Sequence, residues 1–336
     1  MDLRKIVLKP FCGCNANCFA CDSRRELYKK IDRSMEMPLD TLISLLDQAK
    51  ALGTTHIAIS GGEPLFYRNL FQLISESKKR HFTVALNTNG SLITQDLANK
   101  LINSGLDSIF ISIDSFKAKD HDFLRRVPIW SKAVKGLDLL INERDNSKLH
   151  IKIGIRTILT KYILKQLDQM ILFGIDHKVD SHQLSYVEYD KNALLVPSSQ
   201  DIDYFNKNTK DKIKKIITSL PLSNKNDLLI SIDSLFKAHP NRNYSKALYS
   251  SKTVALKSCF RPSSFVIILQ NGDVAPCNLV EYTHKPLIGN IYKTSLNHIW
   301  NNNPILDEFR KKRFDDCKYC PMLIHQKLNY FEGYQS

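Results

Sequence analysis

The sequence predicts an α/β protein whose core is a mostly parallel β-sheet covered by helices. Over the first 190 residues, short apolar segments alternate six times with longer segments of helical periodicity. Most of the short segments are apolar on both faces, as in parallel strands buried between layers. Glycine and polar residues follow several of them directly, as in strand-to-helix turns. In such folds the chemistry belongs at the carboxyl ends of the strands.

Each element has its own local signal. Ile6 to Leu8 form the apolar run of the first strand. The first helix opens at residues 37–40, buries a stripe that runs from Leu42 to Ala49, and ends before Gly53, which suits a C-cap. Further strands are predicted at residues 56–60, 83–87, 108–114, 151–159 and 182–189, with helices at 70–79, 94–103, 130–143 and 165–173.

The character of the chain changes after residue 190. Two polar helices are predicted at 200–217 and 227–237, and the segment holds several prolines and many lysines and asparagines. Beyond it, Asn271, Gly272 and Asp273 form the turn of a hairpin between residues 265–269 and 274–276. We therefore expect a barrel-like or open α/β domain at 1–190, a helical bridge at 191–258 and a small C-terminal module at 259–336.

Composition excludes several classes of protein. No run of about 18 apolar residues is present, which argues against a membrane span. The N-terminus lacks the apolar region of a secretory signal, so we expect a cytoplasmic protein. The net charge is +14, and the basic runs at 78–80, 210–215 and 310–313 are not interleaved with aromatic residues. We interpret them as solvated surface and expect no nucleic-acid partner.

Cysteines form the first candidate site. Cys14, Cys18 and Cys21 lie in one short segment after the first strand. Thiolates suit zinc and iron–sulfur clusters, but structural zinc normally takes four protein ligands. Three thiolates on an iron–sulfur cube would leave one iron for a small molecule. Cys12 is left over, and we regard it as a weak candidate for a hydrogen-atom donor or a packed bystander.

A second group of four cysteines lies in the C-terminal module. Cys277 follows the hairpin, and the others are Cys259, Cys317 and Cys320. Four thiolates satisfy either a tetrahedral zinc ion or every iron of a closed cube. The spacing does not choose between these two metals.

Polar residues follow four of the predicted strands. The segment Gly61-Gly62-Glu63-Pro64 combines two glycines, which permit close backbone approach, with a carboxylate that can accept from an ammonium group. An arginine inside an apolar strand would be costly to bury alone. The remaining candidates at strand ends or within a strand are Thr88, Asn89, Ser112, Asp114 and Arg156.

Together these motifs resemble the radical S-adenosylmethionine (SAM) superfamily. The resemblance rests on the Cys-x3-Cys-x2-Cys spacing and the Gly-Gly-Glu-Pro segment about 40 residues later. It implies a partial barrel of six strand–helix units and a four-iron cluster on Cys14, Cys18 and Cys21, with SAM on the open iron. It also implies SAM contacts from Gly61, Gly62, Glu63, Pro64, Thr88, Asn89, Ser112, Asp114 and Arg156. For Arg156, pairing with a structural carboxylate is an equal alternative.

The C-terminal module resembles the auxiliary-cluster domain called SPASM, in its shortened twitch form. The matching features are Cys259, Gly272-x4-Cys277, Gly289-Asn290-Ile291, Ile299-Trp300-Asn301 and the pair Cys317 and Cys320. No cysteine follows Cys320, so we expect one fully ligated auxiliary four-iron cluster. The module that holds it is expected to consist of a β-hairpin, a helix and a Cys-x2-Cys loop.

The resemblance implies reductive cleavage of SAM to a 5′-deoxyadenosyl radical that takes a hydrogen atom from the substrate. A flavodoxin- or ferredoxin-type donor would supply the electron. The basic charge favours a peptide or protein side chain as substrate, whereas the lack of an added N-terminal recognition domain favours a small carbohydrate or aminocyclitol. The alternative from another class is a non-enzymatic zinc or iron–sulfur module.

Overall fold

The structure is a computed structural model of the 336-residue chain. It describes residues 1–19, 21, 31–147, 149–187, 195–220, 229, 232, 261–277, 287–312 and 326–329. Most of the predicted helix at 227–237 therefore lies outside the described residues, as do Cys259, Cys317 and Cys320. Across these ranges no helix is long and apolar enough to cross a membrane.

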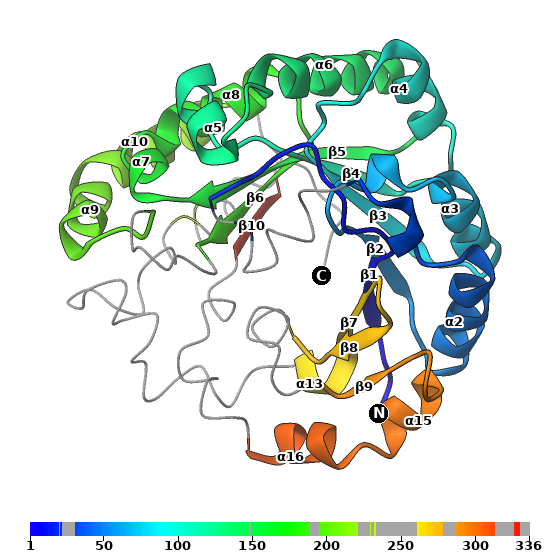
Figure 1. The fold of residues 1–336 in the computed structure, drawn as a ribbon. Coiled ribbons are helices and arrows are strands. Elements are labelled where there is room, and N and C mark those ends of the chain that lie inside the picture. Colours follow the sequence, from blue (N-terminus) through cyan, green and yellow to red (C-terminus); the bar gives the residue numbers. More distant parts are fainter. Residues whose placement is uncertain are drawn as a thin grey trace.

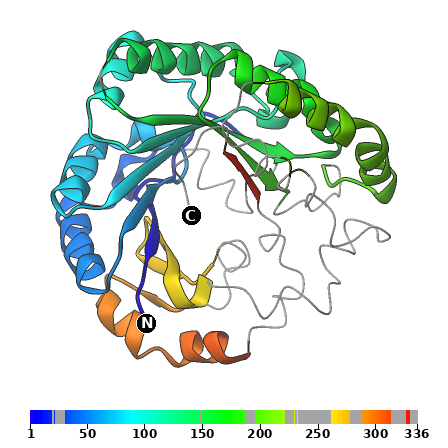
Figure 2. The ribbon, with the colours of Figure 1, turned by 180° about the vertical axis from the view of Figure 1, so that it is seen from behind.

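One curved sheet organises the molecule, and its helices cover the convex side (Figures 1 and 2). The strand order is β10-β6-β5-β4-β3-β2-β1-β7-β8-β9. The first six strands are parallel neighbours in chain order, as the strand–helix alternation predicts. They are β1 (Lys5–Lys9), β2 (His56–Ile59), β3 (Thr83–Thr88), β4 (Ser108–Ser112), β5 (Lys152–Leu159) and β6 (Ser181–Tyr186). The predicted α/β fold class is confirmed.

Helices between these strands bury their apolar stripes against the sheet. In α2 the buried residues are Leu42, Leu45, Leu46 and Ala49, as predicted. Other helices of this layer are α3 (Leu70–Lys79), α4 (Gln95–Ile102), α5 (Ala118–Arg125), α6 (Trp130–Asn146), α7 (Lys161–Leu164) and α8 (Leu167–Asp176); α2 itself spans Leu39–Ala51. Short 3-10 turns lie at η1 (Arg33–Met35) and η2 (Pro64–Phe66).

Two predictions differ in detail from the structure. The helix predicted at 165–173 corresponds to α8, and a short helix that was not predicted, α7, precedes it with Thr160 as its N-cap. Helix α5 was not predicted, since its eight residues carry too few apolar positions to give a periodic stripe. This omission matters for the site described below.

The described part of the bridge is helical, as predicted. It begins with a capping box, in which the side chains of Ser198 and Asp201 each accept a hydrogen bond from the backbone N–H of the other residue. The segment continues as α9 (Ser199–Tyr204), the π-helical turn η3 (Phe205–Thr209) and α10 (Lys210–Ser219). Ile213 and Ile217 bury one face of α10.

The C-terminal strands extend the same sheet. β7 (Phe265–Leu269) pairs in parallel with β1, and it forms the predicted hairpin with β8 (Asp273–Ala275). The other elements are β9 (Gly289–Asn290), β10 (Gln326–Asn329), α13 (Arg261–Ser264), α15 (Leu296–Asn301) and α16 (Pro304–Lys312). The indole N–H of Trp300 donates to the carbonyl of Met1 at 2.7 Å and ties this region to the N-terminus. The predicted domain boundaries stay a prediction.

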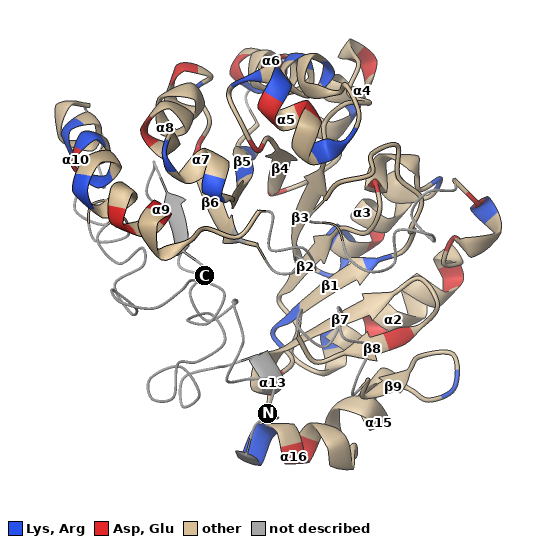
Figure 3. Ribbon diagram, turned by 60° about the vertical axis from the view of Figure 1, so that its left-hand side comes forward, with Lys and Arg blue, Asp and Glu red and all other residues tan. Residues whose placement is uncertain are grey.

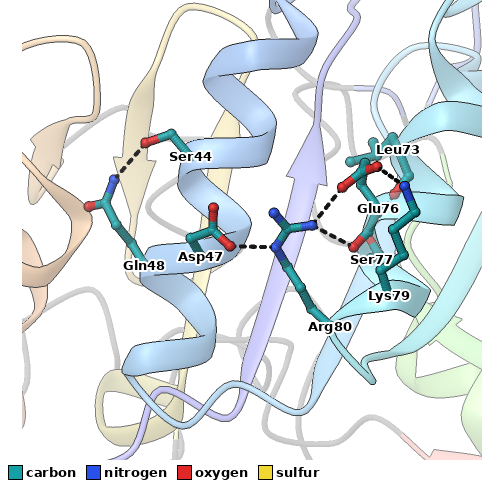
Figure 4. A network of polar contacts seen from close by, with 8 residues as sticks. All are labelled: Ser44, Asp47, Gln48, Leu73, Glu76, Ser77, Lys79 and Arg80. Atoms are coloured by element: carbon teal, nitrogen blue, oxygen red, sulfur yellow. Dashed lines mark hydrogen bonds and ion pairs between the residues drawn. The ribbon is translucent and has the colours of Figure 1, made fainter.

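Charged residues lie mainly on the outer helices and their connections (Figure 3). Arg80 is an example, because its guanidinium joins Asp47 of α2 to Glu76 of α3 at 2.6 and 2.8 Å (Figure 4). Asp47 is 62% exposed, so solvent screens this ion pair and it adds little to stability. These outer charges need no functional role, so we look for functional residues on the side of the sheet that the helices leave uncovered.

Candidate functional site

The loop after β1 packs against the loop after β2 at the carboxyl edge of the sheet. The Gly62 amide donates to the Phe11 carbonyl at 3.0 Å, and the Glu63 amide donates to the Gly13 carbonyl at 2.8 Å. A Cβ atom on Gly62 would lie 2.2 Å from the Cys12 carbonyl oxygen, so only glycine fits there. Gly61 has φ of +133°, and a Cβ atom added to it would lie 2.3 Å from the Phe11 carbonyl oxygen. The two glycines thus let the cysteine loop approach.

Glu63 is buried, and its carboxylate organises the site from within. One oxygen accepts from the Thr88 hydroxyl at 2.6 Å and from the Leu65 amide at 3.1 Å. The other accepts from the Asn89 amide at 2.7 Å. Burial raises the pKa of Glu63, and these hydrogen bonds oppose the rise. A carboxylate has about four acceptor positions, so one stays open for a further donor.

Thr88 and Asn89 connect the end of β3 to the cysteine loop. The Asn89 amide side chain donates to Asn15 at 2.8 Å, and its contact with the Cys14 sulfur is 3.9 Å. Asn15 in turn donates to the Ser91 hydroxyl at 2.9 Å. Asn15 and Ser91 were not predicted, because single amides and hydroxyls in loops carry no sequence signal of their own.

Cys14 is partly buried, and groups that ionise to anions lie near its sulfur. Its sulfur accepts a 3.4 Å hydrogen bond from the Ala16 amide. Burial, with smaller contributions from Glu63, Cys18 and Cys21, raises the pKa of the Cys14 thiol to about 12, although the Ala16 amide lowers it. A free Cys14 is therefore protonated at neutral pH, and metal binding must displace that proton.

Cys18 receives a cationic hydrogen bond that the sequence analysis missed. Arg125, the last residue of α5, donates from Nη1 to the Cys18 sulfur at 3.5 Å. Its Nη2 forms a 2.7 Å ion pair with Asp114, and both side chains are nearly buried. Burial alone would lower the pKa of Arg125, but Asp114 and the Cys18 and Cys14 sulfurs raise it. The guanidinium is thus charged beside Cys18.

The remaining predicted residues divide into two groups. Ser112 and Arg156 are register partners on β4 and β5, and both are half-buried. Arg156 donates from Nε and Nη2 to the side-chain oxygen of Gln183 at 3.1 and 2.8 Å. Asp114 faces Arg125 and the Ile158 amide, which makes it a support for Arg125.

Three further cysteines, Cys12, Cys21 and Cys277, lie within the described residues. The Cys21 amide donates to the Cys18 carbonyl at 3.2 Å, which folds the end of the loop back on itself. Cys12 is 1% exposed and Cys277 is 6% exposed, two residues after β8. Within the described residues, no three His, Cys, Asp or Glu side chains are grouped as ligands of a single metal ion. A four-iron cluster binds each cysteine to a different iron, so its ligands need not converge on one point.

Comparison with known proteins identifies the family. The radical SAM superfamily matches residues 8–165, and the iron–sulfur cluster-binding domain SPASM matches residues 259–321. The chain therefore carries a radical SAM domain followed by a SPASM-type C-terminal domain, and is an enzyme. Its cofactors are accordingly a four-iron cluster with SAM and an auxiliary iron–sulfur centre.

Relatives of known function act on different substrates. One is the tungsten-containing aldehyde ferredoxin oxidoreductase cofactor-modifying protein of Pyrococcus furiosus, 22% identical over 89% of this chain and 81% of that protein. Another is the AdoMet-dependent heme synthase of Methanosarcina barkeri, 24% identical over 92% of this chain and 84% of that protein. Sequence similarity therefore leaves several substrate classes open.

Solved structures share the fold. SuiB of Streptococcus suis bound to SAM has a TM-score of 0.68 at 20% identity, covering 96% of this chain and 72% of SuiB. The enzyme anSMEcpe with bound AdoMet has a TM-score of 0.62 at 18% identity, covering 91% of this chain and 82% of that one. At these identities the likeness supports the fold alone.

The residues present fit an iron–sulfur cluster. Three N–H groups, from Ala16, Asn89 and Arg125, approach the sulfurs of Cys14 and Cys18. Hydrogen bonds of this kind to sulfur are one way in which proteins set the properties of iron–sulfur centres. The loop therefore offers both thiol ligands and the donors that a cluster needs around them.

Proposed function

We propose that the chain cleaves SAM reductively at a four-iron cluster held by Cys14, Cys18 and Cys21. When bound, that cluster supplies one electron to the SAM sulfonium, and the cleavage yields methionine and a 5′-deoxyadenosyl radical that takes a hydrogen atom from the substrate. A flavodoxin- or ferredoxin-type protein is the proposed electron donor. The observation that carries the proposal is the set of N–H donors around the Cys14 and Cys18 sulfurs.

The chain's own residues bind and orient SAM in this proposal. Glu63 uses its open acceptor position for the SAM ammonium group, beside the Gly61–Gly62 backbone. Ser112 and Arg156 receive the SAM carboxylate or ribose from neighbouring strands, which is supported by their register pairing and their partial exposure. Thr88 and Asn89 keep Glu63 and the cysteine loop in place through the contacts described above.

Anaerobic reconstitution tests the cluster assignment. Wild-type protein and a Cys14/Cys18/Cys21→Ala variant are loaded with iron and sulfide, reduced with dithionite and supplied with SAM. We expect 5′-deoxyadenosine only from wild type, while the variant keeps the absorbance of the auxiliary centre. SAM cleavage by the variant, or a fully loaded wild type that forms no 5′-deoxyadenosine, would contradict the proposal.

We place a peptide or protein side chain first among substrates. The chain's +14 charge favours an acidic peptide, and one solved structure of SuiB, with a TM-score of 0.69, is bound to a precursor peptide. In this reaction the auxiliary centre would accept an electron from the substrate radical in an oxidation or cross-linking. It would return an electron in an epimerisation.

A small molecule is the second candidate. The observation that favours it is the heme synthase, which this chain matches over most of its length. To separate the two, cells that produce the protein are grown in deuterated water, and their extract is divided into peptides and small molecules. Each fraction is incubated with the loaded enzyme. Deuterium in 5′-deoxyadenosine identifies the fraction that holds the substrate.

A further inference from the structure

The C-terminal end of α5 is hydrogen-bonded to the cysteine loop on both sides of Cys18. The Asn17 amide donates to the Arg125 carbonyl at 3.1 Å, and the Phe19 amide donates to the Leu124 carbonyl at 2.9 Å. Between these two backbone contacts, Arg125 Nη1 donates to the Cys18 sulfur at 3.5 Å. Three hydrogen bonds from one helix end therefore fix the position of a single cysteine.

Arg125 is itself held rigidly. Its Nη2 pairs with Asp114 at 2.7 Å, and the other Asp114 oxygen accepts from the Ile158 amide at 3.1 Å. The Asp114 amide donates to Nδ1 of the buried His121 at 3.1 Å, so His121 carries its proton on Nε2. The Arg125 side chain is 11% exposed. A charge this deeply buried interacts with its neighbours far more strongly than one in water.

We propose that Arg125 is a positioning residue for Cys18 that also makes the cluster at this loop easier to reduce. Reduction adds one negative charge to the iron–sulfur core. A fixed cation that donates a hydrogen bond to a ligand sulfur stabilises the reduced form more than the oxidised form. Asp114 offsets part of this effect, since its carboxylate lies on the far side of the guanidinium. The inference rests on the proposed cluster ligands.

Arg126 provides a matched control. It is the next residue in the chain and carries the same charge, but its side chain is exposed and its guanidinium lies 5.0 Å from the centre of the Phe19 ring. Solvent screens a charge in that position. An effect of net charge alone would appear in both variants, whereas an effect of the buried sulfur contact would appear only at Arg125.

The experiment compares Arg125→Met, Arg125→Lys, Asp114→Asn and Arg126→Met in full-length reconstituted protein. Iron and sulfide are measured first. The midpoint potential of the cluster whose EPR signal changes on SAM addition is then titrated. We expect Arg125→Met to lower the equilibrium constant for reduction about tenfold, which is about 59 mV for a one-electron couple. The midpoint potential of Arg125→Lys should lie between those of Arg125→Met and wild type. Asp114→Asn should shift the midpoint potential upward, and Arg126→Met should have the potential of wild type.

The outcomes separate this inference from the function it rests on. If Arg125→Met and Arg126→Met load fully and titrate alike, the inference is wrong, although SAM cleavage can still stand. If wild type itself binds no cluster at these cysteines, the ligand assignment is wrong instead. Should Arg125→Met take up no iron, Arg125→Lys and Asp114→Asn decide, because shifts of opposite sign support the inference and equal potentials overturn it.

Discussion

At the scale of single residues, burial removes water from charged groups at this site, and hydrogen-bond partners must replace it. Glu63 is the clearest case, because a carboxylate that is 1% exposed needs partners to offset the loss of water. Its three partners all donate hydrogen bonds, and they come from the turn after β2 and the end of β3. The carboxylate thus joins two strand ends as well as offering an acceptor for SAM.

Glu63→Gln tests this joining role. The variant places an amide NH2 where an acceptor faces N–H or O–H donors, so at least one buried donor loses its partner. We expect the free energy of unfolding to fall by about 1–3 kcal/mol, measured by urea titration. Glu76→Gln, at the exposed network of Figure 4, is the control and should change stability little. Equal effects of the two variants would contradict the role given to Glu63.

His182 predicts a pH dependence of stability. It lies on β6, fully buried, with Nε2 2.8 Å from the Thr157 hydroxyl. Burial lowers its pKa to about 3, from an ordinary value of 6.5. As pH falls below 6.5 the unfolded chain takes up a proton that the folded chain does not. Stability is therefore lost as pH falls from 6.5 towards 3, by about 1.4 kcal/mol per pH unit.

Urea unfolding at several pH values between 7 and 5 measures this slope. His182→Gln cannot take up the proton, so we expect its stability to depend less steeply on pH than that of wild type. The comparison is between slopes, because the substitution also changes stability at every pH. Parallel slopes for the two proteins would show that His182 does not contribute.

At the scale of helices and strands, the conformation of each predicted motif depends on the segments packed against it. The cysteine loop after β1 is shaped by the glycines after β2, by the turn after β3 and by the end of α5. The three segments that follow strands meet because the carboxyl ends of adjacent parallel strands lie at one edge of a sheet, and α5 reaches them through hydrogen bonds to the cysteine loop. A change in one loop should therefore alter metal binding in another.

Gly62→Ala tests that dependence. The backbone of Gly62 is outside the left-handed region, so the obstacle is steric contact with the Cys12 and Gly13 carbonyl oxygens, at 2.2 and 2.3 Å. Backbone shifts that relieve such contacts cost about 1–3 kcal/mol. We expect reduced iron uptake and lower stability. Gly174→Ala, where a Cβ meets a valine side chain at 3.3 Å, should load iron normally; equal iron uptake by both variants would contradict the expectation.

At the scale of the whole molecule, the C-terminal region shares the main sheet. β7 pairs with β1 along five residues, and the Leu296 amide donates to Gln48 of α2 at 2.7 Å. Trp300 is fully buried and bonded to Met1. Because these contacts join the first and last parts of the chain, we expect the two parts to unfold together.

The two tryptophans, Trp130 and Trp300, report on different parts of the chain. In Trp130→Phe the fluorescence follows the C-terminal region, and in Trp300→Phe it follows the strand–helix layer. We expect the fluorescence midpoint in urea to coincide with the circular dichroism midpoint within each variant. Trp300→Ala should lower stability by about 3–5 kcal/mol without creating a second transition. A separate early transition seen by Trp300 would show an independent C-terminal domain.

Much of the fold and the metal chemistry was predictable from local signals. Strand and helix periodicity predicted the parallel sheet, and the spacing of Cys14, Cys18 and Cys21 predicted the cluster chemistry. Both are short-range properties, since side-chain period and ligand spacing are written in consecutive residues. Residues such as Arg125 and Asn15 have no such pattern, and α5 has no apolar stripe to reveal it.

The sequence by itself determined the fold class, the family and the ligand types of this protein. Only the tertiary structure decided that Asp114 supports Arg125, that Arg125 reaches Cys18, and that Glu63 is bonded on both oxygens. The physical reason is distance along the chain. Arg125 and Cys18 are 107 residues apart, and only the register and curvature of the sheet bring them within hydrogen-bonding range.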